Sequence, residues 1–383
     1  MYHHSKGQVI VPTGGGKTMC MINDAQSQFS GTNDRQTIVV VAPRILLAKQ
    51  LASDFVELLG YNQKSPIKVL HVHSGDSEYY STTNKTAIFN WAVDNWKFNK
   101  IIFTTYHSLH RIQESGIPVN TLYFDEAHNS VQRHFFPATK YYSTMGNNRC
   151  YFFTATPKHS TNVQDPGMNN EAVYGKVLEQ VPAPELIQND YILPPKVVIK
   201  QLDMIQTKVA TCEDDADNIL TTIDDQNVSK ILICARRTSQ ITNLVSDSKL
   251  TTELYGRGYN WMYITAKTGA VINGIKVSRE EFFKTLNAWG KEDDRKFIVM
   301  HHSILSEGIN VIGLEAALFL RNMNFIDISQ TIGRVIRKGD NDKKFGIVCV
   351  PVYDKVGIST SRNVQAVVDT IFDQGKPAVS VTS

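Results

Sequence analysis

A glycine-rich run near the amino terminus has the composition of a phosphate-binding loop. The run is Thr13-Gly14-Gly15-Gly16-Lys17-Thr18, and a short apolar stretch precedes it. Consecutive glycines let the backbone curl so that several N–H groups face one anion at the start of the next helix. Lys17 adds positive charge for the β- and γ-phosphates, and the Thr18 hydroxyl can ligate Mg²⁺. The general pattern has glycine where Val11 stands. The alternative is a glycine-rich turn with an incidental lysine, which the flanking strand and helix disfavour.

An apolar stretch at 121–124 ends in two acids, Asp125 and Glu126, followed by Ala127 and His128. In a parallel sheet, residues that leave the carboxyl ends of the strands share one crevice with the phosphate loop. Asp125 there can hold Mg²⁺, directly or through water, and Glu126 can orient and deprotonate an attacking water. A solvated helix cap is the alternative. It would not explain the run Asp-Glu-Ala-His.

A third run, at 328–338, carries two arginines three residues apart, Arg334 and Arg337, which therefore lie on one face of a predicted helix. Arginine suits bidentate contact with phosphate oxygens and stabilises charge during phosphoryl transfer. An ordinary helix with the same spacing is the alternative.

These runs lie in a chain that alternates short apolar stretches with amphipathic ones, which predicts two α/β domains with parallel sheets. Predicted strands cover 8–12, 37–43, 67–73, 100–105, 121–125, 150–154, 196–203, 230–235, 261–265, 296–301, 316–320 and 345–352. Predicted helices cover 17–29, 45–59, 85–96, 239–254, 278–289, 328–337 and 364–374. Residues 158–170 and 212–227 are expected to be irregular surface.

The domain boundary is predicted where four prolines break helix and strand, between Val181 and Pro195. This gives a first domain over 1–180, a linker over 181–195 and a second domain over 196–383.

The composition is that of a globular protein. The chain has 383 residues, 42% hydrophobic and 20% charged, with a formal net charge of +3. So small an excess neither requires nor excludes a polyanionic partner. Five dispersed cysteines without a CxxC pair indicate buried free thiols in a reducing compartment. The absence of a long apolar run or an apolar leader predicts no membrane association and an intracellular, cytoplasmic protein.

The phosphate loop in its Pro-Thr-Gly-Gly-Gly-Lys-Thr form and the Asp-Glu-Ala-His run resemble the motifs of superfamily 2 helicases of the DEAH/DExH type. The run Gln330-x-x-Gly333-Arg334-x-x-Arg337 is similar to the sixth motif of that family, and residues 150–157 to the third. The Pro43-Arg44-x-x-Leu form is closer to restriction-type and phage-type enzymes. The resemblance covers about residues 8–338.

The resemblance implies two RecA-like domains that bind ATP with Mg²⁺ between them. Arg334 and Arg337 would reach the nucleotide from the second domain, and His128 and Gln330 resemble a pair that joins the two walls. Gly308 belongs to a stretch similar to the fifth motif and would contact the nucleotide. Contacts with a nucleic-acid strand are implied for four residues of the first domain and one of the second: Pro43, Arg44, Thr104, Thr105 and Arg236.

The resemblance implies an ATP-dependent helicase or translocase whose ATP hydrolysis is stimulated by nucleic acid, with DNA favoured over RNA. The chain would act as a monomer or as a subunit of a larger complex, in a host cytoplasm if phage-encoded. The alternative is an ATP-gated clamp or remodelling subunit that does not separate strands.

Other chemistry-bearing residues receive a structural interpretation. His71 and His73 alternate on a strand without an acid or cysteine at ligand spacing, so they are expected in the core rather than at a metal. Trp91, Trp96 and Phe89 could stack on bases but are expected to pack in the fold.

Overall fold

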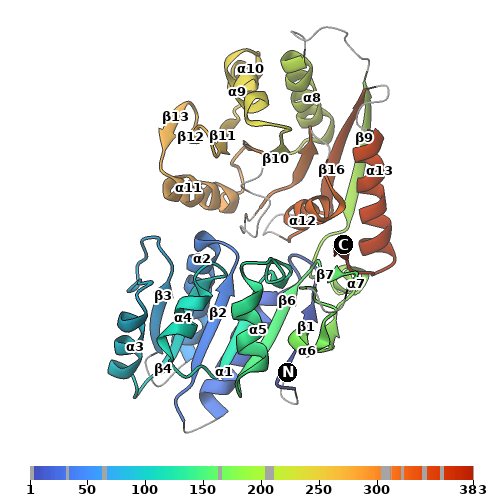
Figure 1. The fold of residues 1–383 in the computed structure, drawn as a ribbon. Helices are drawn as coiled ribbons and strands as arrows, with labels where there is room; N and C mark the ends of the chain where they lie inside the picture. Colours follow the sequence, from blue (N-terminus) through green and yellow to red (C-terminus); the bar gives the residue numbers. More distant parts are fainter. Residues whose placement is uncertain are drawn as a thin grey trace. The chain divides into compact units, whose positions relative to one another are not determined.

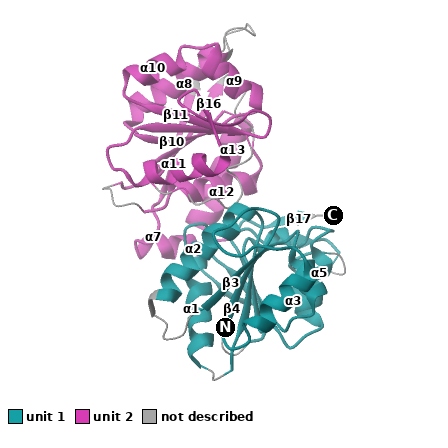
Figure 2. Cartoon of the chain, turned by 90° about the vertical axis from the view of Figure 1, so that its left-hand side faces the viewer, with its two compact units in different colours: residues 1–181, 377–383 teal, residues 182–376 magenta. Residues whose placement is uncertain are grey.

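The protein is represented by a computed structural model in which two compact units are separated in sequence at Val181 and Pro182 (Figure 2). Unit 1 contains residues 1–181 and 377–383, and unit 2 contains residues 182–376. The structure describes residues 4–31, 34–62, 67–162, 166–202, 211–302, 311, 313–320, 323–338, 343–353 and 358–382. Of the linker predicted at 181–195, Val181 belongs to unit 1 and residues 182–195 lie within unit 2; residues 377–383 of the predicted second domain belong to unit 1.

Unit 1 is built on a parallel sheet with the order β3-β4-β2-β5-β6-β1-β8 (Figure 1). Strand β2 is buried along its whole length, which explains why its sequence Thr-Ile-Val-Val-Val-Ala is apolar on both faces. The strands are β1 (Lys6–Ile10), β2 (Thr37–Ala42), β3 (Ile67–Val72), β4 (Asn99–Thr105), β5 (Thr121–Phe124), β6 (Arg149–Thr154) and β8 (Val177–Gln180).

Helices cover both faces of this sheet, because each helix presents one apolar stripe to a buried strand face. Apolar side chains of α1 and α2 pack on one face, and those of α3, α4, α5 and α6 pack on the other. The helices are α1 (Lys17–Gly31), α2 (Ile45–Asn62), α3 (Lys85–Asp94), α4 (Leu109–Ser115), the 3-10 helix η1 (Ala127–Asn129), α5 (Phe136–Thr144) and α6 (Glu171–Tyr174).

A short strand pair attaches the carboxyl-terminal end of the chain to unit 1. Strand β17 (Ser380–Thr382) runs parallel to β7 (Lys158–Ser160), and the Ser380 N–H donates to the carbonyl of Pro157 at 3.0 Å. The pairing explains why residues 377–383 belong to unit 1 although residues 182–376 form unit 2.

Unit 2 contains a second sheet with the order β13-β12-β11-β14-β10-β15-β16-β9. Strands β9 to β11 and β14 to β16 pair in parallel, whereas β12 and β13 add an antiparallel hairpin. The strands are β9 (Pro195–Leu202), β10 (Lys230–Cys234), β11 (Asn260–Thr265), β12 (Gly269–Ile272), β13 (Ile275–Val277), β14 (Phe297–His301), β15 (Ala316–Phe319) and β16 (Gly346–Tyr353).

Helices α8, α9 and α10 cover one face of this sheet, and α11, α12 and α13 lie on the other (Figure 2). The helices are α7 (Ala183–Gln188), α8 (Thr211–Gln226), α9 (Thr238–Ser246), α10 (Leu250–Gly256), α11 (Arg279–Lys291), α12 (Phe325–Val335) and α13 (Ile358–Val367), which continues as a π-helix over Val368–Asp373. Two parallel-sheet α/β units are thus confirmed.

Several local expectations were wrong. Residues 158–160, expected to be irregular surface, form strand β7. The stretch 212–227 forms helix α8, whose apolar residues Ala216, Ile219 and Ile223 are buried, while acids in its first turn suit the helix dipole. The single helix at 239–254 is two helices, because the Ser248 hydroxyl accepts from the Leu250 N–H and starts α10. The hairpin between β12 and β13 was not predicted.

The hairpin turn is Asn273-Gly274, with positive φ at both residues (45° and 84°). This is the dipeptide that two-residue hairpin turns favour, because their twist requires left-handed backbone at both positions. The signal was therefore present in the sequence.

Candidate active site

The glycine-rich loop connects β1 to α1 and places Lys17 as the first residue of the helix. Gly14 and Gly16 have φ values of 87° and 92°, a region that favours glycine. The Gly15 N–H donates to the Pro12 carbonyl at 2.9 Å, which closes a tight turn. The loop therefore ends at the amino terminus of a fifteen-residue helix, where backbone N–H groups and the helix dipole favour an anion.

Lys17 is directed inward from this loop. Its Nζ donates to the Val11 carbonyl at 3.4 Å and lies 3.8 Å from Glu126 Oε1. The side chain is only 9% exposed. The lysine therefore joins the phosphate loop to the acidic end of β5, two parts of the sequence that the sheet brings together.

Sheet order explains this proximity. Strand β6 lies between β1 and β5, so the loop after β1, the end of β6 and the acids after β5 occupy one carboxyl edge. All three strands run parallel, and side chains leaving their carboxyl ends meet at that edge.

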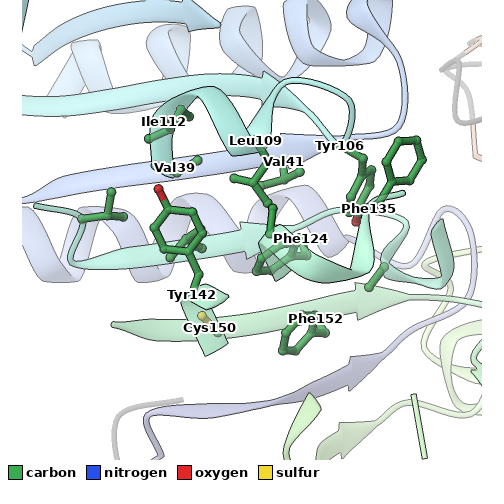
Figure 3. Packing of buried hydrophobic residues seen from close by; sticks show 14 of the residues in the cluster. Val39, Val41, Tyr106, Leu109, Ile112, Phe124, Phe135, Tyr142, Cys150 and Phe152 are labelled. Carbon is green, nitrogen blue, oxygen red and sulfur yellow. The ribbon is translucent and has the colours of Figure 1, made fainter. Parts of the chain in front are cut away.

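The acidic pair is held on a rigid support. The Asp125 N–H donates to the Val41 carbonyl at 2.8 Å, and the buried Tyr106 hydroxyl donates to the Asp125 carbonyl at 2.8 Å. Phe124, one residue earlier, packs against Phe152 with ring centroids 4.7 Å apart (Figure 3). The chain is therefore held in place at the end of β5 and at Asp125 itself.

Glu126 adopts left-handed backbone, with φ 46° and ψ 54°. This conformation costs a residue with a Cβ about 1 kcal/mol. Residues in such conformations concentrate at functional sites. The conformation ends the strand and begins η1. The Glu126 carboxylate, 12% exposed, lies within 4 Å of both Lys17 and His128.

Burial and the neighbouring Glu126 carboxylate raise the pKa of Asp125 to about 7, against the opposing effects of Lys17 and the Glu126 N–H. A carboxyl group that resists ionisation in this way would be stabilised as an anion by a divalent cation. Asp125 and the half-buried Thr18 supply the carboxylate and hydroxyl oxygens that Mg²⁺ prefers. The donor set and the loop therefore fit Mg²⁺ and a nucleotide phosphate.

His128 connects the acids to the end of β6. Its Nδ1 lies 3.0 Å from Thr154 Oγ1, 3.2 Å from Thr156 Oγ1 and 3.6 Å from Glu126 Oε2. Both threonines lie in the stretch 150–157, which resembles the third motif, but neither was predicted as a site residue. Asn129 was not predicted either, and its signal is its place directly after the Asp-Glu-Ala-His run.

Four residues of unit 1 were predicted to contact nucleic acid. Pro43 and Arg44 follow β2, and Thr104 and Thr105 are the last residues of β4, the strand next to it in the sheet. Arg44 is exposed and Pro43 half-buried. The Thr104 hydroxyl, by contrast, donates to the Val72 carbonyl at 2.9 Å, and the Thr105 hydroxyl lies 3.4 Å from Ser108 Oγ. Both threonines are buried. Arg44 is the best placed of the four for an external phosphate.

Unit 2 carries the remaining candidates. Gln330 and Arg334 lie on α12 and Arg337 follows its end; Arg334 is 3% exposed and the other two are half-buried. Arg236 is exposed after β10. Gly308 lies outside the described residues.

Two histidines and three aromatic residues outside the site differ in their burial. His71 and His73 are buried with Nδ1 and Nε2 2.9 Å apart, as expected for core residues. Trp91 packs against the core of unit 1, but Phe89 and Trp96 are exposed, contrary to expectation.

The five cysteines were expected to be buried. Cys20 is exposed and Cys212 is half-buried, whereas Cys150, Cys234 and Cys349 are buried; none forms a disulfide. Within the described ranges, no group of three or more metal-ligating side chains occurs.

None of the helices in the described parts of the chain is long and apolar enough to cross a membrane.

Comparison with known proteins assigns the class. Residues 2–159 match the family ResIII, described as "Type III restriction enzyme, res subunit". No curated protein matches the chain in sequence. The matched region contains the phosphate loop and the Asp-Glu-Ala-His run.

Solved structures extend the similarity to both units. The Type ISP restriction-modification enzyme LlaBIII bound to DNA matches with a TM-score of 0.70 and 17% identity, over 100% of this chain and 30% of that one. A Vibrio vulnificus fragment of a putative HsdR subunit of a type I restriction enzyme gives 0.61 and 15%, over 98% and 64%. Dbp5 of S. cerevisiae, bound to RNA and ADP BeF3, gives 0.59 and 13%, over 98% and 85%.

The fold is therefore that of two RecA-like units, and the match of residues 2–159 to a restriction enzyme subunit agrees with the resemblance to the restriction-type branch. The chain spans less than a third of the length of LlaBIII and of the related enzyme LlaGI.

Proposed function

We propose that the chain is a nucleic-acid-stimulated ATPase that moves along DNA. The observation that carries the proposal is the convergence of Lys17, Asp125 and Glu126 at one edge of the unit 1 sheet, with Lys17 Nζ 3.8 Å from Glu126 Oε1. Such a site suits phosphoryl transfer to water, because a phosphate-binding loop, a metal-binding carboxylate and a general base lie at one edge of the sheet.

Each residue has a role in this proposal. The loop Thr13–Thr18 binds the phosphates, and Thr18 and Asp125 hold Mg²⁺, which supplies charge neutralisation on the phosphate oxygens. Glu126 positions a water and removes its proton. Arg334 and Arg337 of unit 2, and Gly308, complete the site when the units close on the nucleotide. His128 and Gln330 connect hydrolysis to that closure.

DNA is the favoured track. The matched family is that of a restriction enzyme subunit, and LlaBIII and LlaGI were each solved with DNA or a DNA mimic. Dbp5 was solved with RNA, so the fold itself serves either polymer. Pro43, Arg44, Thr104, Thr105 and Arg236 are proposed to contact the backbone of the strand, with Arg44 contributing the most.

The dependence of the ATPase rate on DNA length tests movement. A translocase binds, travels and dissociates at an end, so its steady-state rate per enzyme rises with length and then levels off. An ATP-gated clamp that stays where it binds gives one rate for all lengths above its site size.

The measurement uses single- and double-stranded DNA of graded length, with RNA of the same lengths as the matched control. We expect a rate that rises with DNA length and a smaller response to RNA. A length-independent stimulation would support the clamp, and no stimulation by any polymer would contradict the proposal.

A further inference from the structure

Asn129, the residue directly after the Asp-Glu-Ala-His run, closes the short helix η1 and contacts its own turn. Its side-chain Nδ2 donates to the Glu126 carbonyl at 3.0 Å and lies 3.2 Å from His128 Nε2. Its Oδ1 accepts from the exposed Gln132 Nε2 at 3.2 Å. A carbonyl only accepts and an amide NH₂ only donates, so both contacts require the same orientation of the Asn129 amide.

This orientation determines which nitrogen of His128 carries the proton. The Asn129 NH₂ group has two hydrogens, and one is used by the Glu126 carbonyl. The second is directed at His128 Nε2, which must accept because an amide nitrogen cannot. In a neutral imidazole the proton then resides on Nδ1.

The Nδ1–H faces the polar groups at the site. Thr154 Oγ1 and Thr156 Oγ1 lie 3.0 and 3.2 Å from Nδ1, and Glu126 Oε2 lies 3.6 Å away. A proton on Nδ1 is attracted by all three oxygens. The opposite tautomer would turn a lone pair toward the Glu126 carboxylate and two N–H groups toward each other at Asn129, and both contacts would be repulsive.

We propose that Asn129 is a positioning residue that holds His128 in the Nδ1–H tautomer and thereby orients the Glu126 carboxylate. Asn129 itself touches neither the phosphate loop nor Lys17 in the contacts described. It acts through His128, whose Nδ1–H faces the Glu126 carboxylate and connects it to the end of β6. The catalytic consequence rests on the proposed function, whereas the tautomer does not.

The tautomer is measured directly by long-range ¹⁵N–¹H correlation NMR on the full chain with ¹⁵N-labelled histidine. The eleven histidines give overlapping signals, so His128→Gln identifies the one that disappears. We expect the wild-type His128 pattern to show a protonated Nδ1 and a bare Nε2. A protonated Nε2 on a neutral ring would overturn the proposal.

Two variants test the cause. Asn129→Ala removes the donor, and we expect the His128 signals to shift toward a mixture of tautomers. Asn129→Asp keeps the size but replaces the donor by an acceptor, and we expect Nε2 to become protonated. Gln132→Ala, which touches the same amide from its exposed side, is the matched control and should leave the pattern unchanged. An unchanged Nδ1–H pattern in both Asn129 variants would refute the assignment.

The kinetic arm separates positioning from folding. We expect Asn129→Ala to lower kcat for ATP hydrolysis about five- to tenfold with KM for ATP unchanged, because the phosphate loop is intact. A merely structural loss would instead lower the melting temperature and change KM and kcat together. If the wild type proves to lack ATPase activity, the proposed function fails while the NMR result still decides the tautomer.

Discussion

The two units hold their candidate catalytic groups in different ways. In unit 1 the groups come from separate places in the sequence, after β1, after β5 and at the end of β6. They contact one another: Lys17 lies near Glu126, and His128 lies near Thr154. In unit 2, Gln330 and Arg334 share one helix, and Arg337 follows that helix directly. One set is assembled by a sheet and the other by a single helix.

The support for the unit 2 set lies at the end of that helix. The Leu193 N–H donates to the Ile336 carbonyl at 2.7 Å, and Ile192 forms an antiparallel bridge with Arg337. Asp190 and Lys338 form an ion pair next to them. Residues 192 and 193, at the end of the proline-rich boundary, are therefore hydrogen-bonded or paired to the chain at and before Arg337.

This contrast indicates that the two units contribute to different steps of the proposed reaction. In the proposed function, unit 1 binds the nucleotide and Mg²⁺, because its glycine-rich loop, Lys17 and the two carboxylates lie together at one edge of its sheet. Unit 2 offers positive side chains from a fixed helix end, which suits stabilising charge that develops during transfer. Binding should therefore depend on unit 1 and the rate of hydrolysis on both units.

The largest effect expected from a change in unit 2 separates binding from hydrolysis. Arg337→Lys keeps the charge but removes the planar fork needed for bidentate phosphate contact. We expect kcat for ATP hydrolysis to fall roughly a hundredfold or more, with the Kd for a fluorescent ATP analogue changed less than about threefold. Lys17→Ala should instead weaken nucleotide binding strongly.

Arg257→Lys is the matched control, since Arg257 is paired with Asp224 and Glu253 on the surface of unit 2. It should leave both binding and hydrolysis unchanged. If Arg337→Lys weakened ATP binding as much as Lys17→Ala, the division between the units would be wrong.

A smaller effect concerns the stability of unit 1 in acid. Burial, together with His73 and Lys49, lowers the pKa of His71 to about 4 from its ordinary 6.5. Because the unfolded chain binds this proton more readily, stability is full above pH 6.5 and is lost as the pH falls toward 4. At 1.36 kcal/mol per pKa unit, the loss is about 3 kcal/mol.

His71→Phe removes the titration while keeping a ring beside Tyr79 and Phe103, on which His71 stacks. Urea unfolding of the wild type and variant at pH 7 and pH 4.5 measures the difference. We expect the variant to lose less stability between these values. Equal losses in both proteins would assign the acid sensitivity to other groups.

Much of the fold and site could be predicted from the sequence, because their signals are local. The apolar runs at 37–42 and 121–124 are strands, and the glycines before Lys17 adopt the left-handed backbone that a phosphate loop needs. Sheet order could not be predicted. That β6 lies between β1 and β5, bringing Thr154 to His128, depends on pairing between distant strands.

The failures have physical causes as well. In α8 an acidic first turn concealed the apolar face formed by Ala216, Ile219 and Ile223. At Thr104 the residue type suited a phosphate contact, but its hydroxyl bonds the Val72 carbonyl inside the protein. Direction of a side chain is set by packing, which residue type alone does not reveal.

The steady-state ATPase of the wild type and of Glu126→Gln, each with and without DNA, tests the central claim most directly. The amide keeps the shape of the side chain but cannot remove a proton from water. We predict stimulation by DNA in the wild type and a loss of at least about a thousandfold in kcat for the variant, which still binds the ATP analogue. A variant that hydrolyses ATP at near wild-type rate, or a wild type that ignores DNA, would contradict the account.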